Sequence, residues 1–290
     1  MAESLKFYKH IIENHVGKDV AFFDLRSVGG GCINNAKKIS TSKGDFFIKS
    51  NRDAKPDFFE KEAQGLSYLR KQKIISIPEV IGFGITDETP YILLEFINPG
   101  KTKSNYWEDF GSKLAEMHFV TQNNYGFETD NYIGGIEQSN LQNADWIQFF
   151  VQNRIIHQLD IAKKKKLVNV KLENQFVNLF EKLNDILVVD KPSLLHGDLW
   201  SGNVMTDSDG FVSLIDPAVY YGNREIEIAF TQLFGGFDAK FYQAYFSEFP
   251  VEKGYEKRAD IYNIYPLLVH ANLFGGSYIK SVESILQRFV

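Results

Sequence analysis

The sequence of 290 residues contains one cysteine, Cys32. A single cysteine excludes an internal disulfide framework and any zinc cluster built on cysteine ligands. No apolar run approaches the length of about eighteen residues that a membrane-spanning helix needs, and Met1 is not followed by a charged leader and a long apolar segment. We therefore expect a cytoplasmic protein with no membrane partner.

An excess of positive charge is also missing. The formal net charge is −5, and the longest basic run, Lys163 to Lys166, is short. This balance excludes the cationic field on which sequence-independent nucleic-acid binding depends, so no nucleic-acid partner is expected. Apolar residues are abundant, at 44% of the chain with 14% aromatic. Such a chain can bury one large core or two moderate ones, which excludes disordered and fibrous classes.

The most informative stretch runs from Leu194 to Asn203, with the sequence LLHGDLWSGN, and Asp216 follows a second apolar run. Asp198 and Asn203 match the spacing Asp-x-x-x-x-Asn of kinase catalytic loops, which a metal-binding Asp follows later in the chain. Phosphoryl transfer needs a carboxylate that accepts the hydroxyl proton, and an amide and a second carboxylate that hold magnesium. The alternative is that these residues only cap a turn and end a strand.

A glycine-rich loop stands between the first two of three predicted strands near the N-terminus. Gly29, Gly30 and Gly31 follow a strand over 22–28 and precede a strand over 32–39, and a strand over 46–49 comes after the turn at 43–45. Consecutive glycines let backbone amides approach phosphates closely, although an ordinary hairpin is the alternative. Lys49 lies in the third strand, where kinase-like folds place the lysine that contacts the α- and β-phosphates. An edge-strand lysine is the other interpretation.

A helix is predicted from Pro56 onward, with apolar positions spaced for one face. Glu62 would lie on the inward side and pair with Lys49, with Glu60 as a competitor. The apolar strand over 91–97 ends in Asn-Pro-Gly, and free backbone groups around Glu95 and Ile97 could hydrogen-bond an adenine. The side chain of Glu95 is also explained as a solvated strand end.

Beyond residue 100 the pattern is mainly helical. His118 falls on an apolar helical stripe and is expected to be a core residue. Residues 124–135 are polar and glycine-rich, which predicts a loop that lines a sugar-sized pocket or wraps a surface. Cys32 could bridge only to another chain, so a monomer and a Cys32-linked dimer are both open, as is a plain buried thiol.

Together these motifs make the sequence similar to the fructosamine (ketosamine) kinases, an aminoglycoside-phosphotransferase-like branch of the protein-kinase-like fold. The resemblance spans nearly the whole chain. Its motifs are GGCIN at 30–34, EAQGL at 62–66, YGF at 125–127, DNYIG at 130–134, HGDLWSGN at 196–203, DPA at 216–218, YG at 221–222, RE at 224–225 and LFGG at 273–276. The LWSG segment and the DPA triplet separate this family from other small-molecule kinases of the fold.

The resemblance implies an α+β, two-lobed protein-kinase-like fold. The N-lobe, 1–97, would hold an antiparallel sheet and a helix that cover the nucleotide, and the mainly helical C-lobe, 98–290, would hold the catalytic loop and substrate pocket. The implied roles are a catalytic base at Asp198, magnesium ligands at Asn203 and Asp216, a phosphate-binding Lys49, its partner Glu62, and nucleotide-covering residues Gly29, Gly30, Gly31 and Cys32. One departure is Glu227, where the family pattern has Asp, which leaves open whether it supports the catalytic loop.

The implied reaction is phosphorylation by ATP of the 3-hydroxyl of a ketosamine, either a small molecule or a glycated protein lysine. The product would decompose and free the amine, a deglycation repair. We expect the sugar to contact Trp200, Asn131 and Tyr132, since a sugar ring packs well on an aromatic face; for Trp200 a packing role is the alternative. The rival functions are an aminoglycoside or choline type of kinase and a nucleotide-binding scaffold without turnover.

Overall fold

The computed structural model of the protein describes residues 4–29 and 34–289. It divides into two compact units, Met1–Tyr106 with Gly202–Pro217, and Trp107–Ser201 with Ala218–Val290. The expected division into 1–97 and 98–290 stays a prediction, and the compact units differ from it. The reason lies in backbone pairing, because Gly100 N donates to Thr206 O (3.4 Å) and Lys103 N donates to Gly210 O (3.0 Å).

The first unit is built on a five-stranded antiparallel sheet with strand order β1-β2-β3-β5-β4. Its elements are α1 (Leu5–His15), β1 (Phe22–Ser27), β2 (Asn35–Thr41), β3 (Gly44–Ser50), α2 (Phe58–Gln72), β4 (Val80–Thr86), β5 (Thr89–Glu95), β9 (Val204–Thr206) and β10 (Val212–Leu214). The pair β9–β10 belongs to this unit because Leu214 N donates to Ser76 O (2.9 Å).

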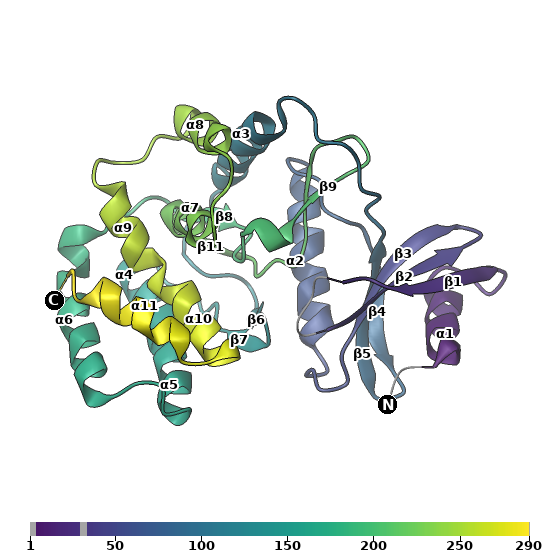
Figure 1. Cartoon of the computed structure of the whole chain (residues 1–290), viewed down its shortest axis with the longest axis horizontal. Helices are drawn as coiled ribbons and strands as arrows, with labels where there is room; N and C mark the ends of the chain where they lie inside the picture. The colour runs from purple at the N-terminus through teal and green to yellow at the C-terminus, as the bar shows by residue number, and fades with distance from the viewer. Residues whose placement is uncertain (1–3, 30–33, 290) are drawn as a thin grey trace. The chain divides into compact units, whose positions relative to one another are not determined.

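Helices α1 and α2 cover opposite faces of this sheet (Figure 1). The hydroxyl of Ser4 caps α1 by accepting from Phe7 N (3.3 Å). The apolar face of α1 then packs on one face of the sheet; the cluster is Phe7, Tyr8, Ile11, Ile12, Ile39, Phe46, Ile48, Tyr91 and Leu93. Successive side chains of a strand point to opposite faces. Since Ile48 faces α1, Lys49 faces α2.

The second unit is mainly helical. Its helices are α3 (Tyr106–His118, which begins at the last residue of the first segment), α4 (Trp146–Phe149), the π-helix η1 (Phe150–Ile156), α5 (His157–Lys164), α6 (Val170–Ile186), α7 (Arg224–Leu233), α8 (Ala239–Glu248), α9 (Tyr255–Tyr262), α10 (Ile264–Phe274) and α11 (Ser277–Leu286). Within the described ranges, no helix is both long and apolar enough to span a bilayer.

Two short antiparallel pairs complete the second unit. Strands β8 (Ser193–Leu195) and β11 (Tyr220–Gly222) pair on either side of the catalytic-loop sequence. Strands β6 (Asn131–Ile133) and β7 (Ile136–Gln138) form a hairpin in which Asn131 is opposite Gln138. The prediction of a loop over 124–135 is therefore wrong for its last part. Gly134 and Gly135 were interpreted as residues typical of a loop, whereas they form the turn between the two strands, with Gly134 at φ 55°.

Candidate active site

Lys49 is the centre of a buried ion cluster in the first unit. Its Nζ lies 2.5 Å from Glu62 Oε1 and 2.7 Å from Asp216 Oδ1. The lysine is only 4% exposed and lies on β3, between β2 and β5, so the edge-strand interpretation is wrong. Glu60, the competitor for this pairing, is exposed and accepts a hydrogen bond from Gln64 instead. The predicted Lys49–Glu62 pair is thus present, and the chain adds Asp216 to it.

The charges in this cluster shift two titrations. Burial opposes the charge of Lys49, but the negative charges of Asp216 and Glu62 outweigh burial, and the pKa of Lys49 is raised. Burial raises the pKa of Glu62 to about 6, against the attraction of Lys49 and with the help of the negative charge of Asp216. At neutral pH both partners of the pair are charged, and Glu62 begins to protonate as the pH falls toward 6.

Asn203 and Asp216 are brought close through the backbone of the first unit. Asn203 ends the 3₁₀ turn η2 (Ser201–Asn203), and its carbonyl accepts from Ile215 N (3.1 Å), one residue before Asp216. Asp216 has φ 55°, a left-handed conformation that few non-glycine residues adopt. Such conformations concentrate at functional sites, where the surroundings must hold them. Here the carboxylate is held by Lys49 and remains 43% exposed.

Asp198 belongs to the second unit, in the segment that follows β8. Gly197, just before it, has φ 86°, and a Cβ added there would lie 2.0 Å from Ala218 O. Only glycine fits this turn and this close approach. The His196 carbonyl accepts from Ala218 N (2.9 Å), so the catalytic loop is anchored to the residues that lead into β11. Asp198 itself is partly exposed.

The backbone of this loop is held by Glu227 from α7. One carboxylate oxygen accepts from Gly197 N (2.7 Å), and the other accepts from His196 N (3.1 Å). The second oxygen also accepts from His118 Nε2 (2.9 Å), and Tyr245 donates its hydroxyl to His118 Nδ1 (2.7 Å). Glu227 is 3% exposed and His118 is 0% exposed. The departure at Glu227 therefore does not remove support from the loop.

Protonation in this buried chain follows from its hydrogen bonds. Burial alone would raise the pKa of Glu227, but the hydrogen bonds from His118 and from the loop amide lower it, so the carboxylate is ionised. Burial lowers the pKa of His118, which keeps the imidazole neutral with its proton on Nε2 toward Glu227. His118 was expected to be only a core residue. The apolar residues on the same face of the helix did not indicate that His118 would bond to Glu227, which lies 109 positions further along the chain.

Trp200 lies two residues after Asp198 and is partly buried. Its ring meets Phe234 edge to face, with the centroids 6.3 Å apart, and the Phe234 ring in turn lies 4.6 Å from His270. An aromatic group of this kind offers a flat apolar surface. The packing interpretation and the sugar-contact interpretation of Trp200 are both compatible with this geometry, and the sugar contact stays a prediction.

Asn131 and Tyr132 both lie on hairpin β6–β7, but they differ in exposure. Asn131 is 8% exposed; its Nδ2 donates to Val219 O (2.8 Å), and its Oδ1 accepts from Gln138 Nε2 (2.8 Å). That side chain is engaged inside the unit. Tyr132 is partly exposed. Direct substrate contact by either residue stays a prediction, and for Asn131 the structure adds a role in holding the hairpin.

The remaining predicted nucleotide contacts are placed unevenly. Gly29 is exposed with open space around it, while Gly30, Gly31 and Cys32 lie outside the described residues. Glu95 ends β5; its N–H donates to Glu79 O (2.9 Å) and its side chain accepts from Glu79 N (3.0 Å), so both serve the sheet edge. Ile97 follows the strand and is partly buried. Adenine binding here stays a prediction.

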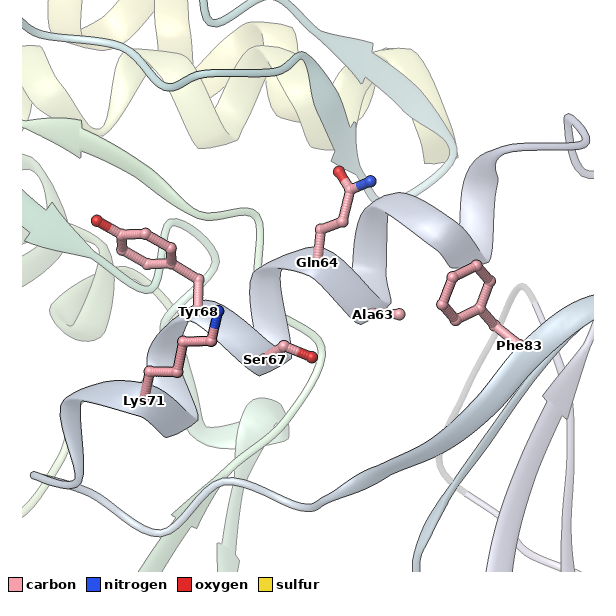
Figure 2. Close-up of a pocket in the computed structure, with 6 residues that line it drawn as sticks. All are labelled: Ala63, Gln64, Ser67, Tyr68, Lys71 and Phe83. Atoms are coloured by element: carbon pink, nitrogen blue, oxygen red, sulfur yellow. The ribbon is translucent and has the colours of Figure 1, made fainter. Parts of the chain in front are cut away.

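A separate shallow pocket of about 240 Å³ lies between α2 and β4 (Figure 2). It is lined by Ala63, Gln64, Ser67, Tyr68, Lys71 and Phe83. Gln64, Ser67 and Lys71 recur at helical spacing on one face of α2. That face differs from the one that carries Phe59, Glu62 and Leu66, so the pocket is not part of the Lys49 cluster.

Comparison with known proteins decides the family. The family model for fructosamine kinase matches residues 5–290. This chain belongs to the fructosamine kinase family. A probable ketoamine kinase of Enterococcus faecium is 40% identical over 264 residues, covering 90% of this chain and 94% of that protein. The chloroplastic protein-ribulosamine 3-kinase of Arabidopsis thaliana is 39% identical over 280 residues, covering 94% of this chain and 85% of the relative.

Solved structures agree with the family and establish the fold. The crystal structure of a protein assigned as a fructosamine-3-kinase, from Haemophilus somnus, has a TM-score of 0.88 and 31% identity over 98% of this chain and 97% of that one. A choline kinase from Streptococcus pneumoniae has a TM-score of 0.65 at 15% identity over 97% and 98% of the two chains, a likeness of fold alone. The prediction of a kinase-like α+β fold with an N-terminal antiparallel sheet is confirmed.

Two substitutions of Glu227 separate the effect of its negative charge from the effect of its side-chain length. Glu227→Gln replaces one acceptor oxygen by an amide that cannot accept from the loop, and an unsatisfied buried amide costs about 1–3 kcal/mol. We expect kcat to fall on the order of tenfold or more and the melting temperature to drop. Glu227→Asp keeps the charge and should retain more activity. Equal activity of both variants and the wild type would contradict the role of Glu227.

The Lys49–Glu62 pair predicts that kcat/KM for ATP falls at acid pH. As the pH falls through about 6, Glu62 protonates, Lys49 loses an orienting charge, and kcat/KM for ATP should decline. Glu62→Gln should have a lower plateau and lack this decline, because no carboxylate is left to titrate there. Initial rates at saturating acceptor over pH 5 to 8, an interval of about three units around that pKa, measure both. An identical decline in Glu62→Gln would assign the titration to another group.

Proposed function

We propose that this protein transfers the γ-phosphoryl group of ATP to the 3-hydroxyl of a ketosamine. The observation that carries the proposal is the ion cluster of the buried Lys49 with Glu62 and the half-exposed Asp216, in a chain that keeps Asp198 and Asn203 at the kinase spacing. The choice of acceptor is supported by the relatives, whose names are ketoamine kinase and protein-ribulosamine 3-kinase. A cytoplasmic location is part of the same proposal.

Each residue has one task in the proposed reaction. Asp198 accepts the proton of the 3-hydroxyl as its oxygen bonds to the γ-phosphorus, and the bond from that phosphorus to the bridging oxygen of ADP breaks. Lys49, oriented by Glu62, binds the nucleotide phosphates. The 3-phosphate is a better leaving group than hydroxide. Loss of a C1 proton and elimination of the 3-phosphate from the ketosamine product would leave an imine. Hydrolysis of that imine by water would free the amine, which makes the reaction a repair of glycated amines or protein lysines.

The donor set at Asn203 and Asp216 fits magnesium. Amide and carboxylate oxygens are hard ligands, and magnesium in such sites is held by one or two protein groups together with substrate phosphates. Asp216 already holds a cation, the Lys49 ammonium, at 2.7 Å. Consistent with this sharing, the described part of the chain has no group of three or more His, Cys, Asp or Glu arranged as a metal cage. When bound, magnesium would neutralise the charge of the nucleotide phosphates.

The rival acceptors are less well supported. An aminoglycoside is a polycation, and residues 123–140, the presumed acceptor region, contain only Glu128, Asp130 and Glu137 as acidic residues. Of these, Asp130 accepts from Asn140 N (2.7 Å) and so serves the hairpin. A scaffold without turnover has no use for an intact set of Lys49, Asp198, Asn203 and Asp216. ATP consumption with ribulose-, erythrulose- and fructose-lysine, an aminoglycoside and choline distinguishes these possibilities.

Asp198→Asn tests the assignment of the base. Loss of proton acceptance should lower kcat by about 10²- to 10⁴-fold, while the dissociation constant for ATP, measured by calorimetry, should change by less than about twofold, because only the reacting hydroxyl loses its partner. Asp209→Asn, an exposed aspartate in the turn between β9 and β10, is the matched control and should behave as wild type. Near-normal turnover by Asp198→Asn would place the base elsewhere.

A further inference from the structure

Hairpin β6–β7 is held by an arginine that is completely buried. Arg154 is 0% exposed and lies in the π-helix η1, an irregularity that often marks functional positions. Its guanidinium carbon lies 4.0 Å from the centre of the Tyr220 ring and 4.7 Å from that of Phe149. One nitrogen donates to Ser139 O (2.6 Å), and another donates to Asn140 Oδ1 (2.8 Å).

The charge of Arg154 is stabilised in an unusual way. In the described part of the chain no carboxylate forms a salt bridge with it, and its partners are carbonyls, an amide oxygen and aromatic faces. Burying a charge without a counter-ion is unfavourable unless every contact is well formed. Within the described residues the two terminal nitrogens of Arg154 have partners, whereas its buried Nε has none. The terminal contacts join Arg154 to Ser139 and Asn140, the two residues that follow β7.

From Arg154 the hydrogen bonds continue through three side-chain amides. Asn140 Nδ2 donates to Asn131 Oδ1 (3.1 Å), and Gln138 Nε2 donates to the same oxygen (2.8 Å). Tyr265 donates its hydroxyl to Gln138 Oε1 (2.5 Å). We call these five residues, Arg154, Asn140, Asn131, Gln138 and Tyr265, the hairpin network. Since Asn131 and Gln138 are opposite each other in the hairpin, the network grips both of its strands.

The hairpin network ends on the backbone that supports the catalytic loop. Gln138 Nε2 donates to Ala218 O (3.1 Å), and Asn131 Nδ2 donates to Val219 O (2.8 Å). Ala218 N donates to His196 O (2.9 Å), and Gly197 packs directly against Ala218 O. The hairpin and the catalytic loop are thus both bonded to the backbone of residues 218–219, and every step of this chain lies in the second unit.

We propose that the hairpin network sets the spacing between hairpin β6–β7 and the catalytic loop and thereby selects the acceptor sugar by its size. The inference rests on the proposed function, in which Tyr132 and Trp200 contact the sugar. The candidate sugars differ by hydroxymethyl groups, and rejection of one extra group depends on the rigidity of the pocket wall. Asn131 and Gln138 are positioning residues in this scheme.

Two buried glutamines provide a matched pair of variants. Gln138 and Gln158 are each 1% exposed and lie in the same unit. Gln138→Met removes the bonds to Asn131, Ala218 and Tyr265. Gln158→Met removes a bond between α5 and α10, in which Asn272 Nδ2 donates to Gln158 Oε1 (2.8 Å), and leaves the hairpin network intact. Steady-state constants for ATP, ribulose-lysine and fructose-lysine, together with melting temperatures, are measured for wild type and both variants.

Gln138→Met should raise KM for the preferred ketosamine about tenfold and leave KM for ATP within about twofold. The ratio of kcat/KM between ribulose-lysine and fructose-lysine should move toward one by about fivefold or more, since a loosened wall discriminates less between sugars of different size. Gln158→Met should lower the melting temperature with both KM values and the selectivity unchanged. Tyr265→Phe removes one hydroxyl only and should shift selectivity in the same direction by less.

The inference is overturned if Gln138→Met and Tyr265→Phe leave the acceptor constants and selectivity unchanged, or if KM for ATP rises in parallel with KM for the ketosamine. If Gln138→Met does not fold, the result for Tyr265→Phe decides. A wild-type protein that phosphorylates neither sugar amine would overturn the proposed function instead, and the two failures are distinguished by the wild-type assay alone.

Discussion

A single ionised carboxylate fixes the catalytic loop of this protein. Glu227 accepts hydrogen bonds from two consecutive loop amides and from a buried histidine, and it is only 3% exposed. An anion in such a place must be fully satisfied, since a buried charge without partners is strongly destabilising. Both partners of the arrangement therefore constrain each other: the loop amides keep Glu227 ionised, and Glu227 keeps the turn at Gly197 in the conformation that presents Asp198.

In the first unit, Lys49 is held by opposite charges rather than by backbone amides. Here three charges share a small volume, with one ammonium between two carboxylates. The carboxylate of Asp216 is 43% exposed, on a residue with a left-handed backbone conformation, whereas that of Glu62 on α2 is 11% exposed. This asymmetry fits the proposed nucleotide site, in which Glu62 would orient the lysine and Asp216 would bind magnesium.

Several parts of this arrangement followed from local pattern. Lys49 was expected on a strand because of its apolar neighbours, and helical spacing directed Glu62 inward, so their pairing required only that α2 pack on the face of the sheet that carries Lys49. Other parts did not. Hairpin β6–β7 was missed because its strands have only three residues each and the two glycines between them are typical of loops. The hairpin is held by a bond from Asn131 to Val219 and, through Asn140, by Arg154, both far from it along the chain.

Family and fold class were thus determined by the sequence by itself, because they depend on residue types at short spacings along the chain, and the same spacings predicted the reacting groups. Only the tertiary structure decided what supports those groups. His118 and Glu227 are 109 residues apart. The guanidinium of Arg154 lies over the ring of Tyr220, a contact that no periodic pattern in the sequence indicates. Long-range hydrogen bonds between buried polar side chains depend on where whole elements dock. The residue composition of a helix or strand favours its burial, but it does not specify which polar side chain of another element will bond to it.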